Sequence, residues 1–267
     1  MVVRGGVAVV TGGASGIGLE LAAAASERHD HVVIGDVDHV ALVDAVAGLS
    51  AAGASVHAVP VDVSDRTSVQ AFARAAFALG PVRMVCMNAG VASSGVPTWE
   101  LRPEQLEFVV GVNFMGLAHS VACFVPGLIG QGGPSGIVVT ASMGGLVALP
   151  NGGGYAASKA AVIAYTKALA GELAVVAPDV SVALLCPSVV ATNLMRTSAV
   201  RSGAIVQEAE LDAAHNAVQA LGVAPEEVAT WVMSAVEARR FWVLPPPDDV
   251  FTEMLVAEFD EIRASLR

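Results

Sequence analysis

Residues 7–18 read Val7-Ala8-Val9-Val10-Thr11-Gly12-Gly13-Ala14-Ser15-Gly16-Ile17-Gly18, and an apolar helical stretch follows over Leu19 to Ala25. This order predicts a strand, a glycine-rich turn and a helix. Such a turn brings backbone N–H groups and a helix N-terminus against a pyrophosphate, and glycine removes the Cβ atoms that would block the approach. The alternative is a glycine turn that binds no phosphate, and the flanking strand and helix argue against it.

A second feature is the run Tyr155-Ala156-Ala157-Ser158-Lys159. The four-residue spacing puts the phenol and the ammonium on one face of a helix. A phenol titrates near pH ~10, and a cation within about 4–6 Å favours the phenolate, so the pair is a candidate proton-transfer device near neutral pH. The alternative is a partly exposed tyrosine that packs on the lysine stem.

Apolar, β-branched segments alternate with helical stretches along the chain, which is typical of a parallel sheet covered on both faces. The expected strands are Val7–Thr11, Val32–Asp36, Val56–Val61, Met84–Asn88, Ile137–Ala141, Val182–Cys186 and Phe241–Leu244. Right-handed crossovers give a doubly wound α/β sheet, of the Rossmann type, with a ligand crevice at the carboxyl ends of its seven parallel strands. We expect one domain over 1–267, with a substrate lid over 193–223 and a C-terminal helical extension over 248–267.

The composition limits the possible partners. The chain has 267 residues and a net charge of −11, which suits one large α/β domain and argues against nucleic acid, because phosphate binding needs clustered Lys and Arg. Cys86, Cys123 and Cys186 lie in apolar runs without a C-x-x-C pair, so we expect buried reduced thiols. The six histidines show no ligand spacing, and we expect no metal. No long apolar segment opens the chain as in a signal peptide, so we expect a cytoplasmic protein.

Taken together, these motifs resemble those of the short-chain dehydrogenase/reductase family, from about Val7 to Leu244. The glycine motif of the family is matched by Thr11 to Gly18, and its Asn-Ala-Gly motif by Asn88-Ala89-Gly90. The catalytic Asn, Ser, Tyr and Lys of the family fall on Asn113, Ser142, Tyr155 and Lys159. One departure follows the sixth expected strand, where the family usually has Pro-Gly and this chain has Pro187-Ser188.

The resemblance implies hydride transfer between an alcohol and a nicotinamide, with Tyr155 as the general acid/base. Lys159 would lower the Tyr155 pKa and bind the nicotinamide ribose. Ser142 would donate a hydrogen bond to the substrate oxygen, where charge develops. Asn113 would hold a water that relays protons. The alternatives are a loop serine that caps a backbone group and a buried structural asparagine with satisfied hydrogen bonds.

Asp36, at the end of the second expected strand, indicates NAD as the cofactor. A carboxylate there accepts hydrogen bonds from the adenosine ribose and would repel the 2′-phosphate of NADP. Residues 35–43 contain no Arg or Lys to compensate. The alternatives are that Asp36 only caps a turn and that Asp62-Val63, which resembles the adenine contact of the family, is an ordinary loop start. The expected cofactor contacts are Gly12, Ser15, Gly16, Ile17, Gly18, Asp36, Asp62, Val63, Asn88, Ala89, Gly90, Tyr155, Lys159, Pro187, Val190 and Thr192.

The substrate pocket is expected from residues after Ser142 and within 193–223. Apolar candidates, equally suited to the core, are Val91, Met143, Leu146, Leu149, Val189 and Met195. Arg196 and Arg201 are either anion ligands or solvated lid charges. We therefore expect a hydrophobic secondary alcohol or ketone, such as a terpenoid, steroid or polyketide-like ring. The competing functions are a 3-oxoacyl thioester reductase, which would ordinarily favour NADPH and a basic patch, and a non-catalytic NAD(H)-binding sensor.

Residues 109–157 contain no Asp, Glu, Lys or Arg. A membrane span is one explanation, but Asn113, His119 and Pro126 interrupt the apolar stretch, so we expect no membrane contact. We expect helices 104–129 and 155–176 to lack a charged outer face, which favours a subunit interface. The resemblance implies a homodimer or homotetramer through these helices. Asp248 or Asp249 should cap an amphipathic C-terminal helix, which would serve the interface or the substrate cleft.

Overall fold

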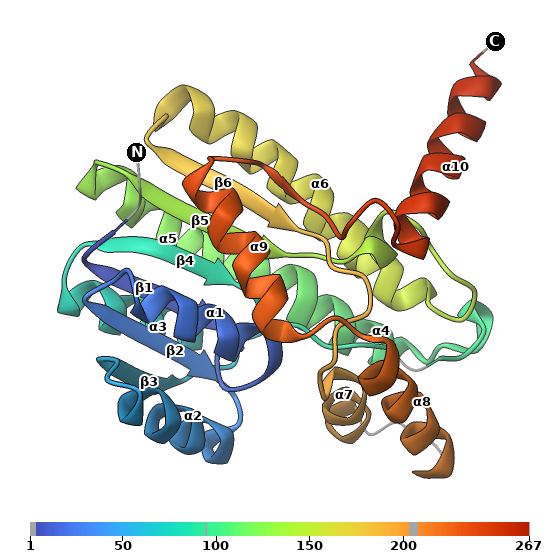
Figure 1. Ribbon diagram of the computed structural model, residues 1–267, viewed down its shortest axis with the longest axis horizontal. Helices are drawn as coiled ribbons and strands as arrows, with labels where there is room; N and C mark the ends of the chain where they lie inside the picture. The colour runs from blue at the N-terminus through green and yellow to red at the C-terminus, as the bar shows by residue number, and fades with distance from the viewer. Residues whose placement is uncertain (1–3, 94, 203–207, 267) are drawn as a thin grey trace.

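The computed structural model describes residues 4–93, 95–202 and 208–266. Its strands form one parallel sheet of seven, in the order β3-β2-β1-β4-β5-β6-β7 (Figure 1). They are β1 (Val7–Thr11), β2 (His31–Asp36), β3 (Val56–Pro60), β4 (Val82–Met87), β5 (Ser135–Thr140), β6 (Val180–Leu185) and β7 (Trp242–Val243). Every expected strand is present with ends shifted by at most two residues, so the doubly wound fold is confirmed.

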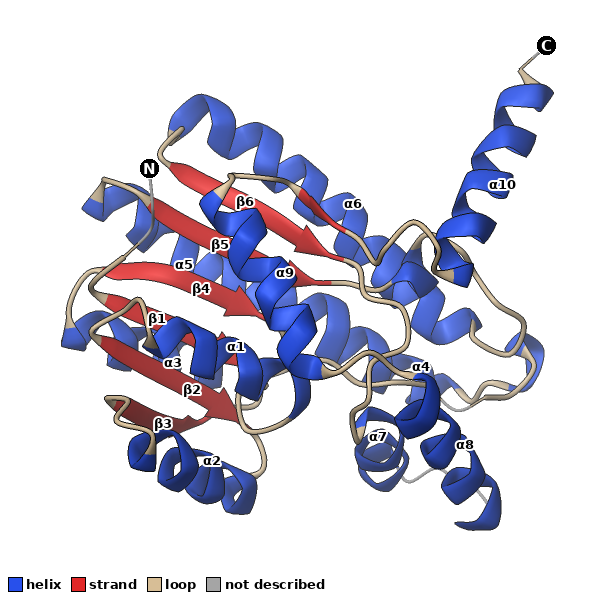
Figure 2. Cartoon of the chain, in the orientation of Figure 1, coloured by secondary structure: helices blue, strands red, loops and turns tan. Residues whose placement is uncertain are grey.

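Helices cover both faces of the sheet (Figure 2). On one face lie α1 (Gly16–Ser26), α2 (His39–Ala51) and α9 (Pro225–Glu237), and on the other lie α3 (Arg66–Leu79), α5 (Gly116–Gln131) and α6 (Gly153–Val176). Alternate residues of a strand point to opposite faces of the sheet. Val7 and Val9 therefore pack in the core beneath α3, α5 and α6, whereas Ala8 and Val10 pack in the core beneath α1, α2 and α9. Two hydrophobic cores therefore hold the sheet between its helical layers.

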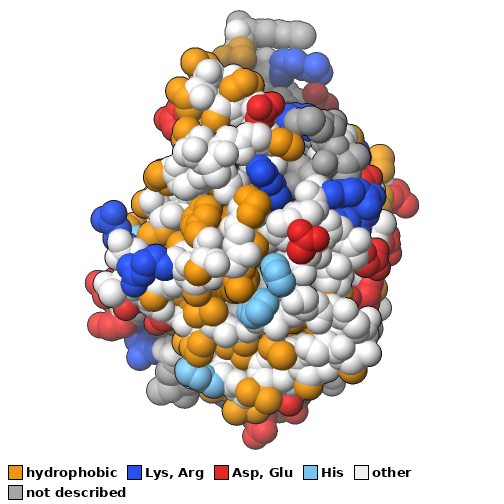
Figure 3. Space-filling view, turned by 90° about the vertical axis from the view of Figure 1, so that its left-hand side faces the viewer, with side chains coloured by type: hydrophobic (Ala, Val, Ile, Leu, Met, Phe, Trp, Pro, Cys, Tyr) orange, Lys and Arg blue, Asp and Glu red, His pale blue; other side chains and the backbone are white. Residues whose placement is uncertain are grey.

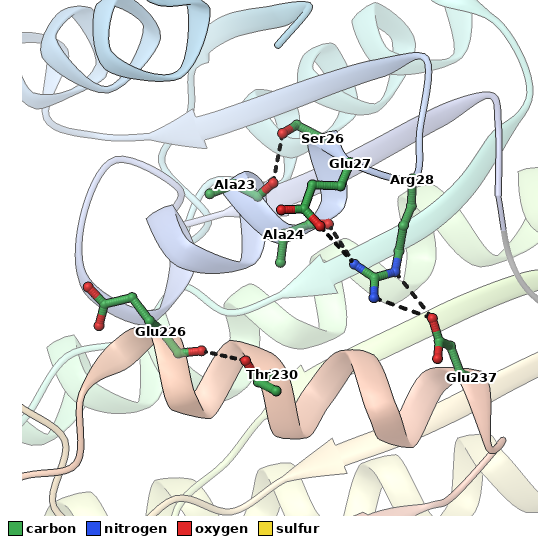
Figure 4. A network of polar contacts seen from close by, with 8 residues as sticks. All are labelled: Ala23, Ala24, Ser26, Glu27, Arg28, Glu226, Thr230 and Glu237. Atoms are coloured by element: carbon green, nitrogen blue, oxygen red, sulfur yellow. Dashed lines mark hydrogen bonds and ion pairs between the residues drawn. The ribbon is translucent and has the colours of Figure 1, made fainter. Parts of the chain in front are cut away.

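The face at the amino ends of the strands carries interspersed positive, negative and hydrophobic side chains (Figure 3). At this end, Arg28 links α1 to α9 (Figure 4). Its guanidinium donates to the Ala24 carbonyl at 3.1 Å and pairs with Glu27 at 3.7 Å and Glu237 at 3.3 Å. Glu237 is partly exposed, so the pair contributes at most about 1 kcal/mol. The larger share of the α1–α9 attachment is apolar packing.

The segment Pro103–Gln131 is long and apolar enough to cross a membrane by length and composition alone, with a mean hydropathy of 1.8. It consists of α4 (Pro103–Val110), a π-helical turn (Gly111–Met115) and α5. In the structure 44% of its apolar window is buried, and Leu117, Phe124 and Leu128 pack in the core beside α3. These are the contacts of a core helix. The absence of a membrane partner stays a prediction.

The outer faces of α4 and α6 are charged, which corrects the expectation. Glu104 and Glu107 are exposed on α4, and Lys167 and Glu172 are exposed on α6. The solvent-facing positions of a helix recur every three to four residues, and these side chains fall there. Apolar side chains lie exposed among them, including Leu106, Met115, Ile129 and Val175. The surface is therefore mixed rather than uniformly apolar.

The expected lid over 193–223 includes residues 203–207, which lie outside the described residues. Its described part contains α7 (Leu194–Ser202) and α8 (Glu208–Leu221), and α10 (Val250–Ser265) lies in the expected C-terminal extension. Asp249 caps α10, since its carboxylate accepts the Phe251 N–H at 2.9 Å. This confirms one of the two predicted caps. Beyond its first turns α10 projects away from the sheet and its helices (Figure 1).

Candidate active site

A cavity of about 390 Å³ opens where β1, β2, β4, β5 and β6 end. Ligands bind at this edge in doubly wound sheets. The described residues that line the cavity include every expected cofactor contact except Gly18, together with Ser142. Ser188 and Arg201, which the sequence analysis named without assigning them to the cofactor, also line the cavity. Further lining residues that the sequence did not single out are Val37, Asp38, Ala41, Val61, Val112, Thr140, Ala141, Asn193, Leu194 and Thr197.

The glycine turn between β1 and α1 is closely packed. Gly12 has a φ of 64°, and a Cβ on it would lie 2.9 Å from the Cα of Ala89. Gly16 has a φ of 51°, and a Cβ there would lie 3.0 Å from Thr192. A Cβ on Gly18 would lie 1.9 Å from the Gly12 carbonyl oxygen. Gly18 thus lets α1 approach the turn and stays behind the cavity wall, whereas Gly12 and Gly16 line it.

Ser15 precedes the first residue of α1, and its side chain makes no capping hydrogen bond. The first N–H groups of a helix lack intrahelical partners and carry a partial positive charge, so this helix end is suited to an anion. Ser15, Gly16 and Ile17 all line the cavity at this point. The turn therefore has the geometry of a phosphate cradle.

Asn88 joins three strand ends. Its Nδ2 donates to the carbonyls of Thr11 at 3.2 Å and Gly12 at 3.3 Å, and its Oδ1 accepts the Thr140 hydroxyl at 3.0 Å. The Thr11 hydroxyl also accepts the backbone N–H groups of Asn88 and Ala89. Asn88 therefore both lines the cavity and fixes the glycine turn. Thr11 and Thr140 were missed as site-forming residues, although both are the last residues of strands beside the motifs.

One end of the cavity carries the carboxylates of Asp36, Asp38 and Asp62. The Asp36 carboxylate accepts the N–H groups of Ala14 at 3.3 Å and Asp38 at 3.2 Å. Asp62 accepts the N–H and hydroxyl of Ser64, at 2.9 and 2.6 Å. Both aspartates thus order their turns and also line the cavity. The cations among the described lining residues, Lys159 and Arg201, lie elsewhere on the wall.

The side chains of Ser142 and Tyr155 both lie beside Gly144. The Ser142 hydroxyl accepts the Gly144 N–H at 3.1 Å, and a Cβ on Gly144 would lie 3.4 Å from both that hydroxyl and Cε1 of Tyr155. The Lys159 Nζ lies 5.8 Å from the centre of the Tyr155 ring and donates to the Thr140 carbonyl at 3.0 Å. The structure thus gathers three of the four expected catalytic side chains on one wall of the cavity.

Asn113 lies behind that wall, in the π-helical turn, a feature that is frequent at functional sites. Its Oδ1 accepts the Val91 N–H at 2.8 Å, and its Nδ2 donates to the Val91 carbonyl at 3.0 Å and the Ser158 hydroxyl at 2.9 Å. A Cβ on Gly90 would lie 3.3 Å from both Asn113 and the Lys159 Nζ. Asn113 is therefore a satisfied buried amide that lies close to Lys159.

Burial dominates the electrostatics of this wall. It lowers the pKa of Lys159 to about 8 and raises the pKa of the neighbouring Cys186 thiol to about 12. Burial also raises the Tyr155 pKa, and a hydrogen bond with the Ser142 side chain partly offsets this. The sequence predicts that Lys159 lowers the Tyr155 pKa; the structure corrects this, because burial of the phenol raises that pKa and the Ser142 hydrogen bond is what lowers it.

The expected substrate residues are placed differently from one another. Val91 lines the cavity, whereas Met143 is 1% exposed in the core and Leu149 is 42% exposed on a loop. Leu146 packs against the core. Val189 and Met195 are half-buried and lie outside the lining set. The sequence shows that these residues are apolar but not where each side chain points. Their directions depend on the course of the turns after β5 and β6.

The wall that α7 contributes consists of Leu194, Thr197 and Arg201. Their spacing of three and four residues puts them on one helix face, and Met195 lies about 100° of rotation away from Leu194. This spacing was the signal that could have identified them. The Arg201 guanidinium lies 6.0 Å from the Phe108 ring centre. Arg196 instead pairs with Asp212 of α8, so the two arginines have different roles.

Among the described residues, no group of three or more His, Cys, Asp or Glu is placed to hold a metal ion. The cysteines are free thiols, with Cys86 and Cys186 buried and Cys123 half-buried. A metal-independent site stays a prediction from the sequence.

Comparison with known proteins adds a family match. Residues 6–202 match the family model described as short chain dehydrogenase. The 1-deoxy-11-beta-hydroxypentalenate dehydrogenase of Streptomyces avermitilis is 36% identical over 243 residues, which cover 90% of this chain and 84% of that enzyme.

Solved structures agree with this match. A short chain dehydrogenase/reductase from Burkholderia phymatum, in complex with NAD, superposes with a TM-score of 0.91 at 36% identity, covering 99% of this chain and 96% of that one. A variant of the actinorhodin polyketide ketoreductase, solved with NADPH, superposes with a TM-score of 0.77 at 30% identity, covering 90% of this chain and 94% of that one.

Proposed function

Because this chain belongs to the short chain dehydrogenase family, we propose that it is an NAD-dependent oxidoreductase that interconverts a hydrophobic secondary alcohol and its ketone. The observation that carries the proposal is the presence of Ser142, Tyr155 and Lys159 in the same cavity as the glycine turn. The glycine turn is suited to bind a dinucleotide, and the three side chains in the same cavity are suited to transfer a proton.

The residues present fit a dinucleotide. Gly12 and Gly16 form a cradle that a Cβ would fill, the N-terminus of α1 opens into it, and Asp36 lies at the far end. Related proteins have been solved with NAD and with NADPH, so the family alone does not choose between them. Asp36, with Asp38 and Asp62 near it, favours NAD because a 2′-phosphate would meet carboxylates.

When bound, a nicotinamide supplies the acceptor or donor of the hydride. The Tyr155 phenolate accepts the proton of the substrate alcohol during oxidation, and the Tyr155 hydroxyl donates a proton to the ketone oxygen during reduction. Ser142, whose hydroxyl retains a proton to donate while it accepts the Gly144 N–H, stabilises the negative charge that develops on the same oxygen. Lys159 places an ammonium 5.8 Å from the centre of the Tyr155 ring, on the side of the cavity where we place the nicotinamide ribose.

The substrate class is proposed from the lining and from the relatives. Val91 and Leu194 line the same cavity as Ser142 and Tyr155 and are suited to apolar contact. One relative is named for a hydroxypentalenate, a terpenoid, and one structural neighbour is a polyketide ketoreductase. We therefore place a terpenoid, steroid or polyketide-like ring first among the candidate substrates. The cytoplasmic location remains a prediction from the sequence.

Two other functions compete. A 3-oxoacyl thioester reductase would use the same catalytic groups, but the net charge of −11 and Asp36 argue against an acidic carrier and NADPH. A sensor that only binds NAD(H) would have no use for Ser142 and Tyr155 in the cavity. The observations thus favour the dehydrogenase.

The test of the proposal is the absorbance change at 340 nm with NAD⁺ and a panel of cyclic, steroidal and acyclic secondary alcohols, with 3-hydroxyacyl thioesters included. We expect turnover with a hydrophobic ring alcohol. Turnover with the thioesters alone would replace the proposal with its first competitor. No absorbance change with any compound of the panel, from protein that binds NADH, would favour the sensor.

The cofactor preference gives a separate prediction. Asp36→Ala removes the carboxylate that meets the ribose, so the ratio of kcat/KM for NAD⁺ over NADP⁺ should fall by about ten-fold or more, roughly 1.4 kcal/mol. Asp44→Ala is the control, because Asp44 is exposed on α2 outside the cavity. An unchanged ratio in Asp36→Ala would assign the preference to other residues.

A further inference from the structure

The turn after β6 runs from Cys186 to Val190 and borders the cavity through Pro187, Ser188 and Val190. Its backbone is fixed by three neighbours. The Cys186 N–H donates to the Val243 carbonyl at 2.9 Å, the Pro187 carbonyl accepts the Met143 N–H at 2.9 Å, and the Val189 carbonyl accepts the Val223 N–H at 3.0 Å. Because Met143 adjoins Ser142, this turn shares a hydrogen bond with the loop that carries a catalytic hydroxyl.

Ser188 adds a contact that glycine cannot make. Its hydroxyl donates to the Asp249 carboxylate at 2.6 Å, a short, charge-assisted hydrogen bond. Ser188 does not have a positive φ, so the backbone at this position does not require a glycine. The serine that departs from the usual Pro-Gly pattern is therefore compatible with the turn and ties it to the C-terminal extension.

Asp249 is itself held in place. One carboxylate oxygen accepts the Phe251 N–H as the cap of α10, and the Asp249 N–H donates to the Pro246 carbonyl at 3.1 Å. The preceding Pro245-Pro246-Pro247 restricts the backbone between β7 and this point. Phe251 and Leu255, in the first turns of α10, pack on the core cluster that contains Met143 and Val147. The partner of Ser188 is therefore held by its own hydrogen bonds and by the packing of α10 on the core.

We infer that Asp249 is a positioning residue, which acts through the Ser188 hydroxyl to fix the Cys186–Val190 turn against the cofactor. The inference rests on the proposed function, since it assigns this side of the cavity to a dinucleotide. The C-terminal extension is then coupled to the active site by one hydrogen bond. Loss of either partner leaves the three backbone hydrogen bonds of the turn but removes its side-chain restraint at Ser188, so a bound dinucleotide must supply that restraint at the expense of binding free energy.

The test compares Ser188→Ala, Asp249→Ala and the double variant by fluorescence titration with NADH and by thermal unfolding. Ser188→Ala keeps the α10 cap, so it removes the tie between turn and extension alone. We expect each single variant to bind NADH about ten-fold more weakly and the double variant to bind no more weakly than Asp249→Ala. Ser188→Thr, which retains a hydroxyl, should restore most of the affinity.

Asp248→Ala is the matched control, because Asp248 is exposed and adjoins Asp249; its NADH affinity should equal that of the parent. Parent-like NADH binding by Ser188→Ala would overturn the inference. So would additive losses in the double variant, because the two residues would then act independently. These readouts do not need turnover, so an inactive but NADH-binding protein would contradict the proposed function and leave this inference standing.

Discussion

At the scale of single residues, the buried ammonium of Lys159 lowers the stability of the folded protein. Lys159 is 4% exposed, and the Thr140 carbonyl is the one hydrogen-bond partner of its ammonium among the described residues. Burial lowers its pKa from the ordinary 10.5 to about 8. An ammonium held in this way destabilises the folded state, because the unfolded chain solvates it fully. The proposed function therefore assigns the position of Lys159 beside Tyr155 to proton transfer and cofactor binding rather than to folding.

Lys159→Met should therefore abolish turnover and stabilise the protein at pH 7, by on the order of 1–3 kcal/mol. Between pH 8 and 10.5 the unfolded chain binds a proton that the folded chain has released, so parent stability rises with pH there. The advantage of the variant should shrink across that window. Urea unfolding at pH 7 and pH 10 measures it, and Lys167→Met, exposed on the same helix, is the control. A less stable variant at pH 7 would contradict this account.

At the scale of elements, the glycine turn and α1 form one unit. The absence of a side chain at Gly18 lets α1 pack against the Gly12 carbonyl. Asn88, which directly follows β4, donates a hydrogen bond to the same carbonyl. The phosphate cradle is thus formed by contacts between elements as well as by the loop itself. A residue outside the cavity can therefore control the shape of the cradle.

Gly18→Ala should push α1 away from the turn, because its Cβ would lie 1.9 Å from a backbone oxygen. We expect a stability loss of about 1–3 kcal/mol and NADH binding at least ten-fold weaker. Gly48→Ala is the control, since Gly48 lies within α2 with open space around its Cβ position. It should stabilise the protein by about 0.5–1 kcal/mol without altering NADH binding. Equal behaviour of the two variants would rule out the packing role.

Elements and motifs could be predicted from the sequence because each depends on local pattern. Apolar β-branched runs identify the strands, and parallel strands place their carboxyl ends, with Asp36 and Asn88, at one edge. The direction of Met143 and the bond between Ser188 and Asp249 could not be predicted. They depend on contacts between segments distant in the chain, for which the sequence gives residue types without distances.

At the scale of the whole molecule, the π-helical turn between α4 and α5 exposes Met115, and α6 exposes Val175 near charged side chains. This mixed surface is compatible with the proposed homodimer or homotetramer, since subunit interfaces combine apolar and polar residues. Light scattering after size-exclusion chromatography should give a mass of two or four chains. Met115→Glu should shift it towards smaller species, whereas Val43→Glu, exposed on α2, should not. A monomeric parent protein would exclude the proposal.

The central claim is that Tyr155 transfers the proton while a bound nicotinamide exchanges the hydride. The most direct measurement is turnover by Tyr155→Phe, at 340 nm with the best alcohol of the panel, beside its NADH affinity. Phenylalanine keeps the ring and removes only the hydroxyl, so NADH binding should stay within about two-fold of the parent. We predict that turnover falls by at least about 10²-fold, the scale of general acid–base catalysis. Parent-like turnover with normal NADH binding would contradict the account.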